Sequence, residues 1–218
     1  MQLADGTPLL RANIRLPRVG VWHGNVEILT ATKLSGKVTL VSSAGLSLTG
    51  TIKEAEVVRD VLQARIVGGA AGMPTETGPK FYESMTFGHA LRELLGEVGE
   101  TLSPTSDATA TGTALARWVR MAGSASDQLD QIVRKLGVDW RVLPDGTVWV
   151  GKDTFPTIQT SGPGAPEFTL IDERGDRAFY MLGVEDAWLV PGVTFLDKKI
   201  GYVVHLIDDR ARTEAYFE

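Results

Sequence analysis

The chain has 218 residues, of which 43% are apolar and 22% charged, the composition of an ordinary globular protein with one large or two small domains. It contains no cysteine, which excludes disulfides, thiolate zinc sites and cysteine nucleophiles. The net charge of -5 and the pI near 5.3 argue against a general nucleic-acid binder, and no apolar run approaches the roughly 20 residues that a membrane helix needs.

The N-terminal part of the chain is predicted to be rich in strands. Residues 1–18 are expected to form an arm, and residues 19–80 a first β module. Within 22–28, apolar Trp22, Val26 and Ile28 alternate with His23, Asn25 and Glu27, which predicts a strand with one polar face. The apolar spacing over 54–69 would also suit a helix, but the β-branched residues there favour two strands turning at Arg59–Asp60. We expect a small antiparallel meander that curls into a barrel.

Residues 81–137 are predicted to form a helical zone. Ser84 or Thr86 can cap a helix that carries apolar residues at three- and four-residue spacing over 87–98. Gly99 is expected to end this helix.

The rest of the helical zone contains a linker and two further predicted helices. Residues 101–112 lack periodicity and predict a linker, and 114–121 predict a short helix. Ser124 to Asp127 has the spacing of a capping box, and Gly137 follows the last apolar residue of the helix that it opens.

A second β module is predicted over 138–218. Residues 138–151 form a hairpin around Pro144–Gly146, and the remainder is expected to supply barrel strands. Those four strands are predicted over residues 167–172, 177–190, 200–207 and 212–217. The order of elements predicts an α+β chain with two antiparallel β-barrel-like modules joined by a helical zone.

The histidines do not suggest a metal site. His23, His89 and His205 are far apart in the sequence. His89 and Glu93 are four residues apart on one predicted helix face and could both touch a metal, but they lack a third ligand nearby, so a solvated helix face is favoured. We expect no metal and no cofactor.

The carboxylates offer one catalytic possibility. Glu93, Glu97 and Glu100 cluster on or just after the first helix, and a pair of them could support glycoside hydrolysis. Acids on the outer side of an amphipathic helix are typical of a solvated face, which we favour. Because no Gly-x-Ser-x-Gly motif occurs either, no catalytic residues are predicted.

The segment 67–74 is the most glycine-dense part of the chain and resembles a phosphate loop. It matches neither the Walker spacing nor Gly-x-Gly-x-x-Gly, so a structural role is favoured, with Gly68 and Gly69 adopting positive φ or packing closely. A second possibility is that this loop, including Gly72, approaches a neighbouring subunit.

The tryptophans are predicted to pack in the core or to mark interfaces. Trp118 and Trp140 lie on apolar faces and predict core positions, whereas Trp22 and Trp149 lie beside turns or on sheet surfaces, where aromatic residues often mark interfaces. Trp188 fits either place. The interface candidates are therefore Trp22, Gly68, Gly69, Gly72, Trp149 and Trp188.

Several segments taken in order resemble the baseplate hub proteins of tailed bacteriophages. They are 66–73 with Tyr82, 91–103, 136–151, 189–195 and 212–217. The resemblance implies two tail-tube-like barrels joined by helical elements, with three copies in a ring that adapts the sixfold tail tube to a threefold spike. It also implies residence in the virion tail after assembly in the host cytoplasm. The implied partners are further copies of the chain, a tail tube or tube-initiator protein, spike and baseplate proteins, and DNA as passing cargo, without a membrane.

Two other functions stay open at this point. One is a tail-associated peptidoglycan hydrolase that uses Glu93 and Glu97. The other is a carbohydrate-binding accessory module that uses Trp22 or Trp149. No segment looks like a spike or a lytic domain, so the resemblance implies no enzyme activity.

Overall fold

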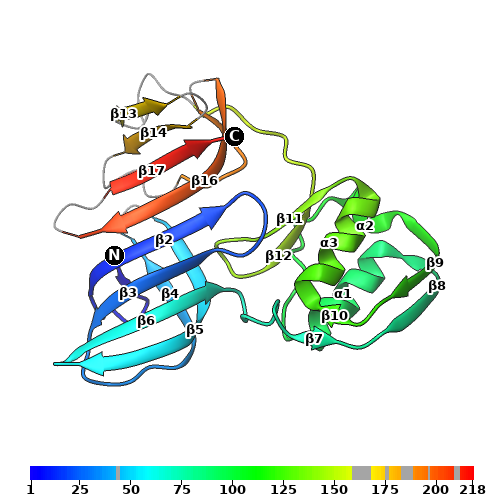
Figure 1. Cartoon of the computed structure of the whole chain (residues 1–218), viewed down its shortest axis with the longest axis horizontal. Helices are drawn as coiled ribbons and strands as arrows, with labels where there is room; N and C mark the ends of the chain where they lie inside the picture. Colours follow the sequence, from blue (N-terminus) through cyan, green and yellow to red (C-terminus); the bar gives the residue numbers. More distant parts are fainter. Residues whose placement is uncertain (43–44, 159–167, 175–176, 183–188, 196, 209–211) are drawn as a thin grey trace. The chain divides into compact units, whose positions relative to one another are not determined.

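The computed structural model describes residues 1–42, 45–158, 168–174, 177–182, 189–195, 197–208 and 212–218. The chain divides into two compact units (Figure 1). The first unit combines Met1–Gly68 with Asp153–Glu218, and the second is Gly69–Lys152. None of the helices in these ranges is long and apolar enough to cross a membrane.

The first unit is built on one antiparallel sheet. Its strands run in the order β1-β4-β5-β6-β3-β2-β16-β17-β14-β13, and β15 pairs with β16. The sheet curls like part of a barrel (Figure 1). The strands are β1 Gln2–Leu3, β2 Leu9–Pro17, β3 His23–Leu29, β4 Gly36–Val41, β5 Ser47–Val58, β6 Val61–Gly68, β13 Phe168–Arg174, β14 Arg177–Leu182, β15 Thr194–Phe195, β16 Lys198–Ile207 and β17 Arg212–Phe217.

Pairing between β2 and β16 distinguishes this sheet from the two β modules expected from the sequence. Leu16 lies opposite Val203, and Ile14 lies opposite His205. The C-terminal strands therefore continue the sheet of the first zone, and residues 1–18 supply two strands of that sheet, β1 and β2, rather than a separate arm. The physical reason is that β2 has one buried and one exposed face and two edges whose backbone groups need partners, which β3 and β16 provide.

The hairpin of β5 and β6 follows the prediction for residues 54–69. Arg59 and Asp60 both have positive φ, 50° and 63°, as a two-residue hairpin turn of the primed type requires. Val58 pairs with Val61 directly beside that turn. The choice of two strands rather than a helix is confirmed.

The second unit combines three helices with three two-stranded sheets. The sheets pair β7 with β10, β8 with β9 and β11 with β12. The elements are β7 Glu76–Thr77, β8 Lys80–Thr86, α1 Phe87–Glu97, α2 Ala108–Gly112, β9 Ala114–Arg120, β10 Gly123–Ser124, α3 Ala125–Leu136, β11 Asp139–Val142 and β12 Val148–Gly151.

The predicted helix ends are confirmed at the positions where a capping residue was the basis of the prediction. The Thr86 hydroxyl caps α1 by accepting from the His89 N–H, and the Ser124 hydroxyl caps α3 by accepting from the Asp127 N–H. Gly137 ends α3 in the left-handed conformation with φ of 65°.

Two predictions in the helical zone were wrong. Residues 114–121 do not form a helix, because 114–120 pair as β9 with β8, where Trp118 lies opposite Tyr82 and stacks on it with ring centroids 5.4 Å apart. A cross-strand partner outweighs the helical spacing of a short segment. The expected linker also contains α2, which Asp107 caps through the N–H groups of Thr109 and Ala110.

A histidine is buried in the sheet of the first unit. His205 is 2% exposed, its Nδ1 lies 2.9 Å from the Thr213 hydroxyl, and its Nε2 is buried without a protein partner. Burial lowers the pKa of His205 to about 4. In the folded chain the ring therefore stays neutral over the pH range in which an exposed histidine becomes protonated.

This burial predicts a pH-dependent stability. Because the unfolded chain takes up a proton on His205 near pH 6.5 and the folded chain only near pH 4, the free energy of unfolding should fall as the pH drops through this window, by on the order of 3 kcal/mol in total. Urea unfolding at pH 7 and pH 5, followed by tryptophan fluorescence, measures the change. His205→Gln should reduce the difference between the two pH values, and the exposed control His89→Gln should retain it. An unchanged pH dependence in His205→Gln would contradict the assignment.

Candidate functional site

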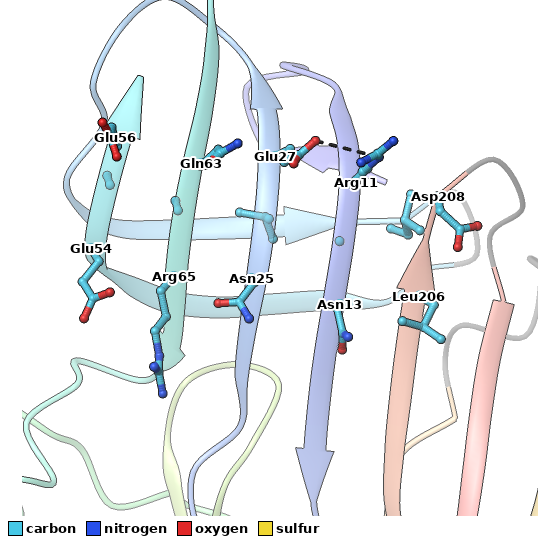
Figure 2. A pocket seen from close by; sticks show the side chains of 15 residues that line it. Arg11, Asn13, Asn25, Glu27, Glu54, Glu56, Gln63, Arg65, Leu206 and Asp208 are labelled. Carbon is cyan, nitrogen blue, oxygen red and sulfur yellow. Dashed lines mark ion pairs between the residues drawn. The ribbon is translucent and has the colours of Figure 1, made fainter. Parts of the chain in front are cut away.

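One face of the sheet in the first unit carries polar side chains in rows that run across the strands. On β2, Arg11, Asn13 and Arg15 are exposed, and the residues between them are buried. The strand register sets each of them beside a polar residue of β3, which confirms the polar side predicted for 22–28. We call this the polar face, and Figure 2 shows two of its rows: Arg11, Glu27, Gln63 and Glu56, and then Asn13, Asn25, Arg65 and Glu54.

The polar face is hollowed into an open groove. Its volume is about 710 Å³, and residues of β2, β3, β5, β6 and β16 line it. Leu206 and Asp208 stand at the β16 side (Figure 2). A groove this open is less enclosed than a small-molecule pocket and can face a large partner or a channel.

Charges on the polar face largely offset one another. Arg11 and Glu27 lie 3.9 Å apart, and Arg212 bonds Asp208 at 3.0 Å and Glu214 at 3.1 Å. Each of the two rows in Figure 2 contains both an arginine and at least one carboxylate, so these rows do not form the basic stripe that tight nucleic-acid binding requires.

An aromatic stack continues the polar face on β16 and β17. Tyr202 and Tyr216 stack with centroids 4.2 Å apart and planes at 12°, and the Arg15 guanidinium carbon lies 4.2 Å from the Tyr202 centroid. Burial raises the pKa of Tyr216 to about 12, and the hydrogen bond from its hydroxyl to Glu214 acts in the same direction. This end of the face is thus held by two stacked phenol rings and one guanidinium.

Two of the interface candidates are buried against each other inside the first unit. Trp22 is 1% exposed, and a Cβ added to Gly68 would stand 2.5 Å from the Trp22 indole nitrogen. Gly68 leaves room for the indole ring of Trp22. Close packing within one chain therefore explains why a glycine and a tryptophan occupy these two positions.

The glycine-dense segment binds an anion that the chain itself supplies. The Glu100 carboxylate is buried, and it accepts from the Ala70 N–H at 3.0 Å and the Gly72 N–H at 2.8 Å. A Cβ on Gly69, which has φ of 71°, would stand 2.5 Å from a Glu100 oxygen, and a Cβ on Gly72 would stand 2.0 Å from the Val98 carbonyl. We call this the Glu100 loop. It explains the likeness to a phosphate loop, because both arrange backbone N–H groups around negative charge.

The expectation that Glu100 lies on a solvated helix face was therefore wrong. The residue follows α1, which ends at Glu97 with Val98 as its cap, and the left-handed Gly99 redirects the chain before Glu100. A turn of this kind breaks the helical periodicity on which the prediction depended.

The remaining tryptophans occupy different environments. Trp140 is buried as predicted, whereas Trp118 is half-buried. Trp149 is half-buried, donates from its indole nitrogen to the Thr105 carbonyl at 3.1 Å, and lies 4.1 Å from the Arg141 guanidinium carbon. Its interface role stays a prediction. Trp188 lies outside the described residues.

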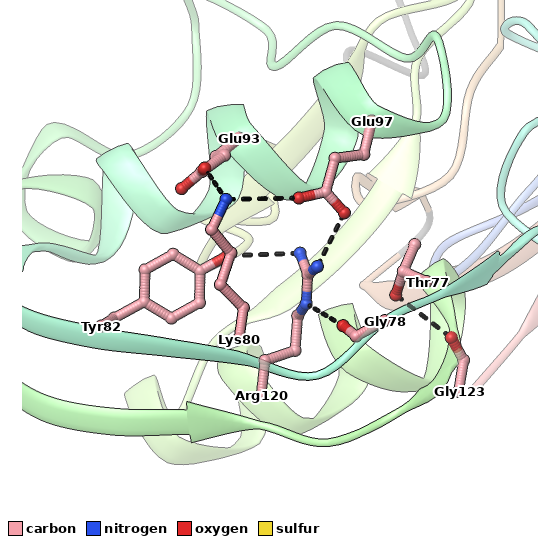
Figure 3. A network of polar contacts seen from close by, with 8 residues as sticks. All are labelled: Thr77, Gly78, Lys80, Tyr82, Glu93, Glu97, Arg120 and Gly123. Carbon is pink, nitrogen blue, oxygen red and sulfur yellow. Dashed lines mark hydrogen bonds and ion pairs between the residues drawn. The ribbon is translucent and has the colours of Figure 1, made fainter.

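A buried arginine joins the β8–β9 ribbon to α1. Arg120 is 2% exposed and donates to the Gly78 carbonyl at 3.1 Å, the Tyr82 hydroxyl at 3.2 Å and Glu97 at 2.7 Å (Figure 3). Each of the three guanidinium nitrogens thus has an acceptor, which offsets the cost of burying the charge.

The carboxylates considered for hydrolysis belong to the same network. Lys80 pairs with both Glu93 and Glu97 (Figure 3). Glu93, the helical neighbour of His89, therefore has a cation partner on β8, and the two carboxylates hold α1 against the ribbon. In the part of the chain that the structure describes, no three His, Asp or Glu side chains are grouped to hold a metal ion.

The Glu100 loop predicts a stability effect. Glu100→Ala removes the acceptor for two backbone N–H groups in a buried site, so the free energy of unfolding should fall by about 2–4 kcal/mol in denaturant unfolding. Glu100→Gln keeps one acceptor oxygen and should lose less. The exposed Glu56→Ala is the control and should change stability by less than about 0.5 kcal/mol. Equal stability of Glu100→Ala and Glu56→Ala would show that the loop does not depend on the carboxylate.

Comparison with known proteins gives matches in structure alone. No protein-family model matches this sequence, and no curated protein sequence does. A 43 kDa tail protein of prophage MuSo2 from Shewanella oneidensis has a similar fold, with a TM-score of 0.65 and 9% identity over 96% of this chain and 93% of the other. A tail protein from Neisseria meningitidis MC58 gives a TM-score of 0.60 and 12% identity over 96% and 91%.

A third solved structure belongs to a secretion system. It is an E. coli component of the type VI secretion system, which exhibits structural similarity to the T4 bacteriophage tail proteins gp27 and gp5. Its TM-score is 0.65 with 12% identity, over 99% of this chain and 74% of the other. The resemblance expected from the sequence is thus confirmed at the level of fold: over nearly its whole length, this chain is folded like tail proteins of phages and prophages.

Proposed function

We propose that this chain is a structural subunit of a phage-type tail, a baseplate hub protein that forms a ring of three copies. The observation that carries the proposal is the likeness in fold to tail proteins, which spans nearly all of both chains and leaves no large part of either unmatched. In this proposal the ring joins the tail tube, or a tube-initiator protein, to spike and baseplate components, and it needs no cofactor.

The polar face is the part of the chain that we assign to the channel. A surface that DNA must pass has to be hydrated without holding phosphates, because each phosphate neutralised by a fixed cation adds affinity. Two of the four arginines on this face are paired, Arg11 with Glu27 and Arg212 with Asp208 and Glu214, and Arg65 lies opposite Glu54 in the strand register. The neighbouring Glu54 and Glu56 add negative charge, which repels the phosphate backbone.

The ring itself gives the first prediction. Purified protein at high concentration should have the mass of three chains in native mass spectrometry, and antibody against it should label the tail end of assembled particles in electron microscopy. A chain that stays monomeric and labels no particle would refute the proposal.

The channel assignment gives a second prediction. Glu54→Lys places an unpaired cation on the polar face, so DNA should bind the ring more tightly at low salt, and particles carrying the variant should release DNA more slowly. The matched control is Glu76→Lys, the same change at an exposed site of the second unit. If both variants bind DNA equally and release it at the same rate, the polar face does not line the channel.

A further inference from the structure

The third row of the polar face contains an arginine and no carboxylate. It runs from Arg15 on β2 through His23 on β3 and Val67 on β6 to Thr51 on β5. On the other side of Arg15, the register with β16 places Val204. Because each of the two rows before it combines an arginine with at least one carboxylate, the balance of charge on the polar face changes at Arg15.

Arg15 lies against an aromatic ring rather than against an acid. Its guanidinium carbon is 4.2 Å from the centroid of the Tyr202 ring, and Tyr216 stacks on the same ring with centroids 4.2 Å apart. Among the residues that the structure describes, the guanidinium of Arg15 has no hydrogen bond and no ion pair. The ring therefore supports the cation without using its N–H groups, which remain available to an acceptor from outside the chain.

The carboxylate nearest to this site along the strands already has partners. Glu214 lies opposite Val204 and accepts hydrogen bonds from the Arg212 guanidinium at 3.1 Å and from the Tyr216 hydroxyl at 2.9 Å. Among the described arginines of the polar face, Arg15 is therefore the one whose positive charge the chain compensates least.

A hollow of about 380 Å³ surrounds this cation. Its lining includes the amides of Asn13 and Asn25, the imidazole of His23 and the two tyrosines. The volume is within the range of about 300–1,000 Å³ that is typical of ligand sites. Asn13 and Asn25 (Figure 2) also line the larger groove of the polar face, so an occupant of the hollow can extend along that groove.

The groups around the hollow fit one phosphate of a nucleic-acid backbone. Arg15 supplies one full positive charge, which equals the negative charge of one backbone phosphate, and a guanidinium can bind two phosphate oxygens at once. The amides of Asn13 and Asn25 add neutral donors. The adjoining groove suits a polymer that carries one such charge at each regular step, because its neighbouring units can continue along the face.

We infer that Arg15 and the hollow around it bind one phosphate of a nucleic-acid backbone, so that each chain offers DNA a single uncompensated cation on the polar face. The inference rests on the proposed function, in which DNA passes along this face. In a ring of three copies, three such contacts retain a DNA end at rest. They are too few to prevent its movement, since affinity for DNA grows with the number of phosphates that are neutralised.

DNA binding by single-charge variants tests the site. The probe is a short fluorescein-labelled DNA duplex, and its fluorescence anisotropy reports binding to the purified full chain. Arg15→Gln should weaken binding about tenfold at low salt and reduce the slope of log Kd against log salt concentration by about one phosphate per chain. Arg11→Gln removes the same charge from the same side of the same strand, but from an arginine beside Glu27, and should weaken binding less than about twofold.

Two further variants separate the geometry of the site from charge alone. Arg15→Lys keeps the charge but loses the planar fork of donors, so it should retain only part of the affinity. Tyr202→Leu removes the ring against which the guanidinium lies and should weaken binding although Arg15 is unchanged. Thermal unfolding checks the fold of each variant, and Arg15→Gln should unfold like the unaltered chain because Arg15 is exposed.

Modified and competing ligands identify the anion. A duplex whose backbone carries neutral methylphosphonates should bind the unaltered chain and Arg15→Gln equally weakly, because it has no charge for Arg15 to contact. If an oligoglutamate peptide displaces the labelled duplex more readily than unlabelled DNA does, the hollow is a site for an acidic protein segment and the inference is wrong. An unaltered chain that does not bind the duplex at low salt also overturns the inference.

Failure of the inference and failure of the proposed function give different results. If the chain forms the ring and labels tails, but Arg15→Gln and Arg11→Gln bind the duplex equally well, the proposed function stands and the phosphate site is wrong. If the chain forms no ring and labels no tail, but Arg15→Gln binds the duplex much more weakly than Arg11→Gln, the phosphate site stands and the proposed function is wrong.

Discussion

The pairing of β2 with β16 is the interaction on which the first unit depends. It joins Leu16 to Val203 and Ile14 to His205, and without it the strands before Gly68 and those after Asp153 would be two small sheets with open edges. Paired, they bury a common apolar face and expose a continuous polar one. The continuity of the polar face across the seam follows from this register, since shifting it by a single residue would turn the Tyr202 side of β16 away from Arg15.

The second unit depends on carboxylates held by the backbone and by cations. Glu100 organises the loop that follows Gly68, and Glu97 joins Arg120 of the ribbon to α1. Both interactions join elements of a unit whose sheets have two strands each. Removing one partner of a buried ionic contact leaves the other uncompensated, so each contact favours one arrangement of the loop and the ribbon. They hold the ribbon with Phe81 and Val119 on its exposed side.

The features that could be predicted from the sequence are those that a few neighbouring residues determine. The caps at Ser124 and Gly137 and the Arg59–Asp60 turn are each set by a few neighbouring residues, and the structure has them where expected. The polar face was visible strand by strand from alternation in 22–28. Its rows were not, because they depend on the register between β2, β3, β6 and β5, and their continuation onto β16 depends on segments nearly the whole chain apart. The β9 strand was missed for a similar reason, since its partner lies before α1. The burial of Glu100 could have been inferred only by asking which anion a glycine-rich loop without a phosphate motif would bind.

The seam between β2 and β16 also has a consequence for synthesis on the ribosome. The early strands emerge first, but the edge of β2 finds its partner only after about 190 further residues have been translated, as the separation of Ile14 from His205 requires. Until then the incomplete sheet has an open edge. Because the contacts between β2 and β16 are far apart in the sequence, this unit is expected to fold late and slowly. Nascent chains therefore cannot present a finished polar face before β16 has been synthesised.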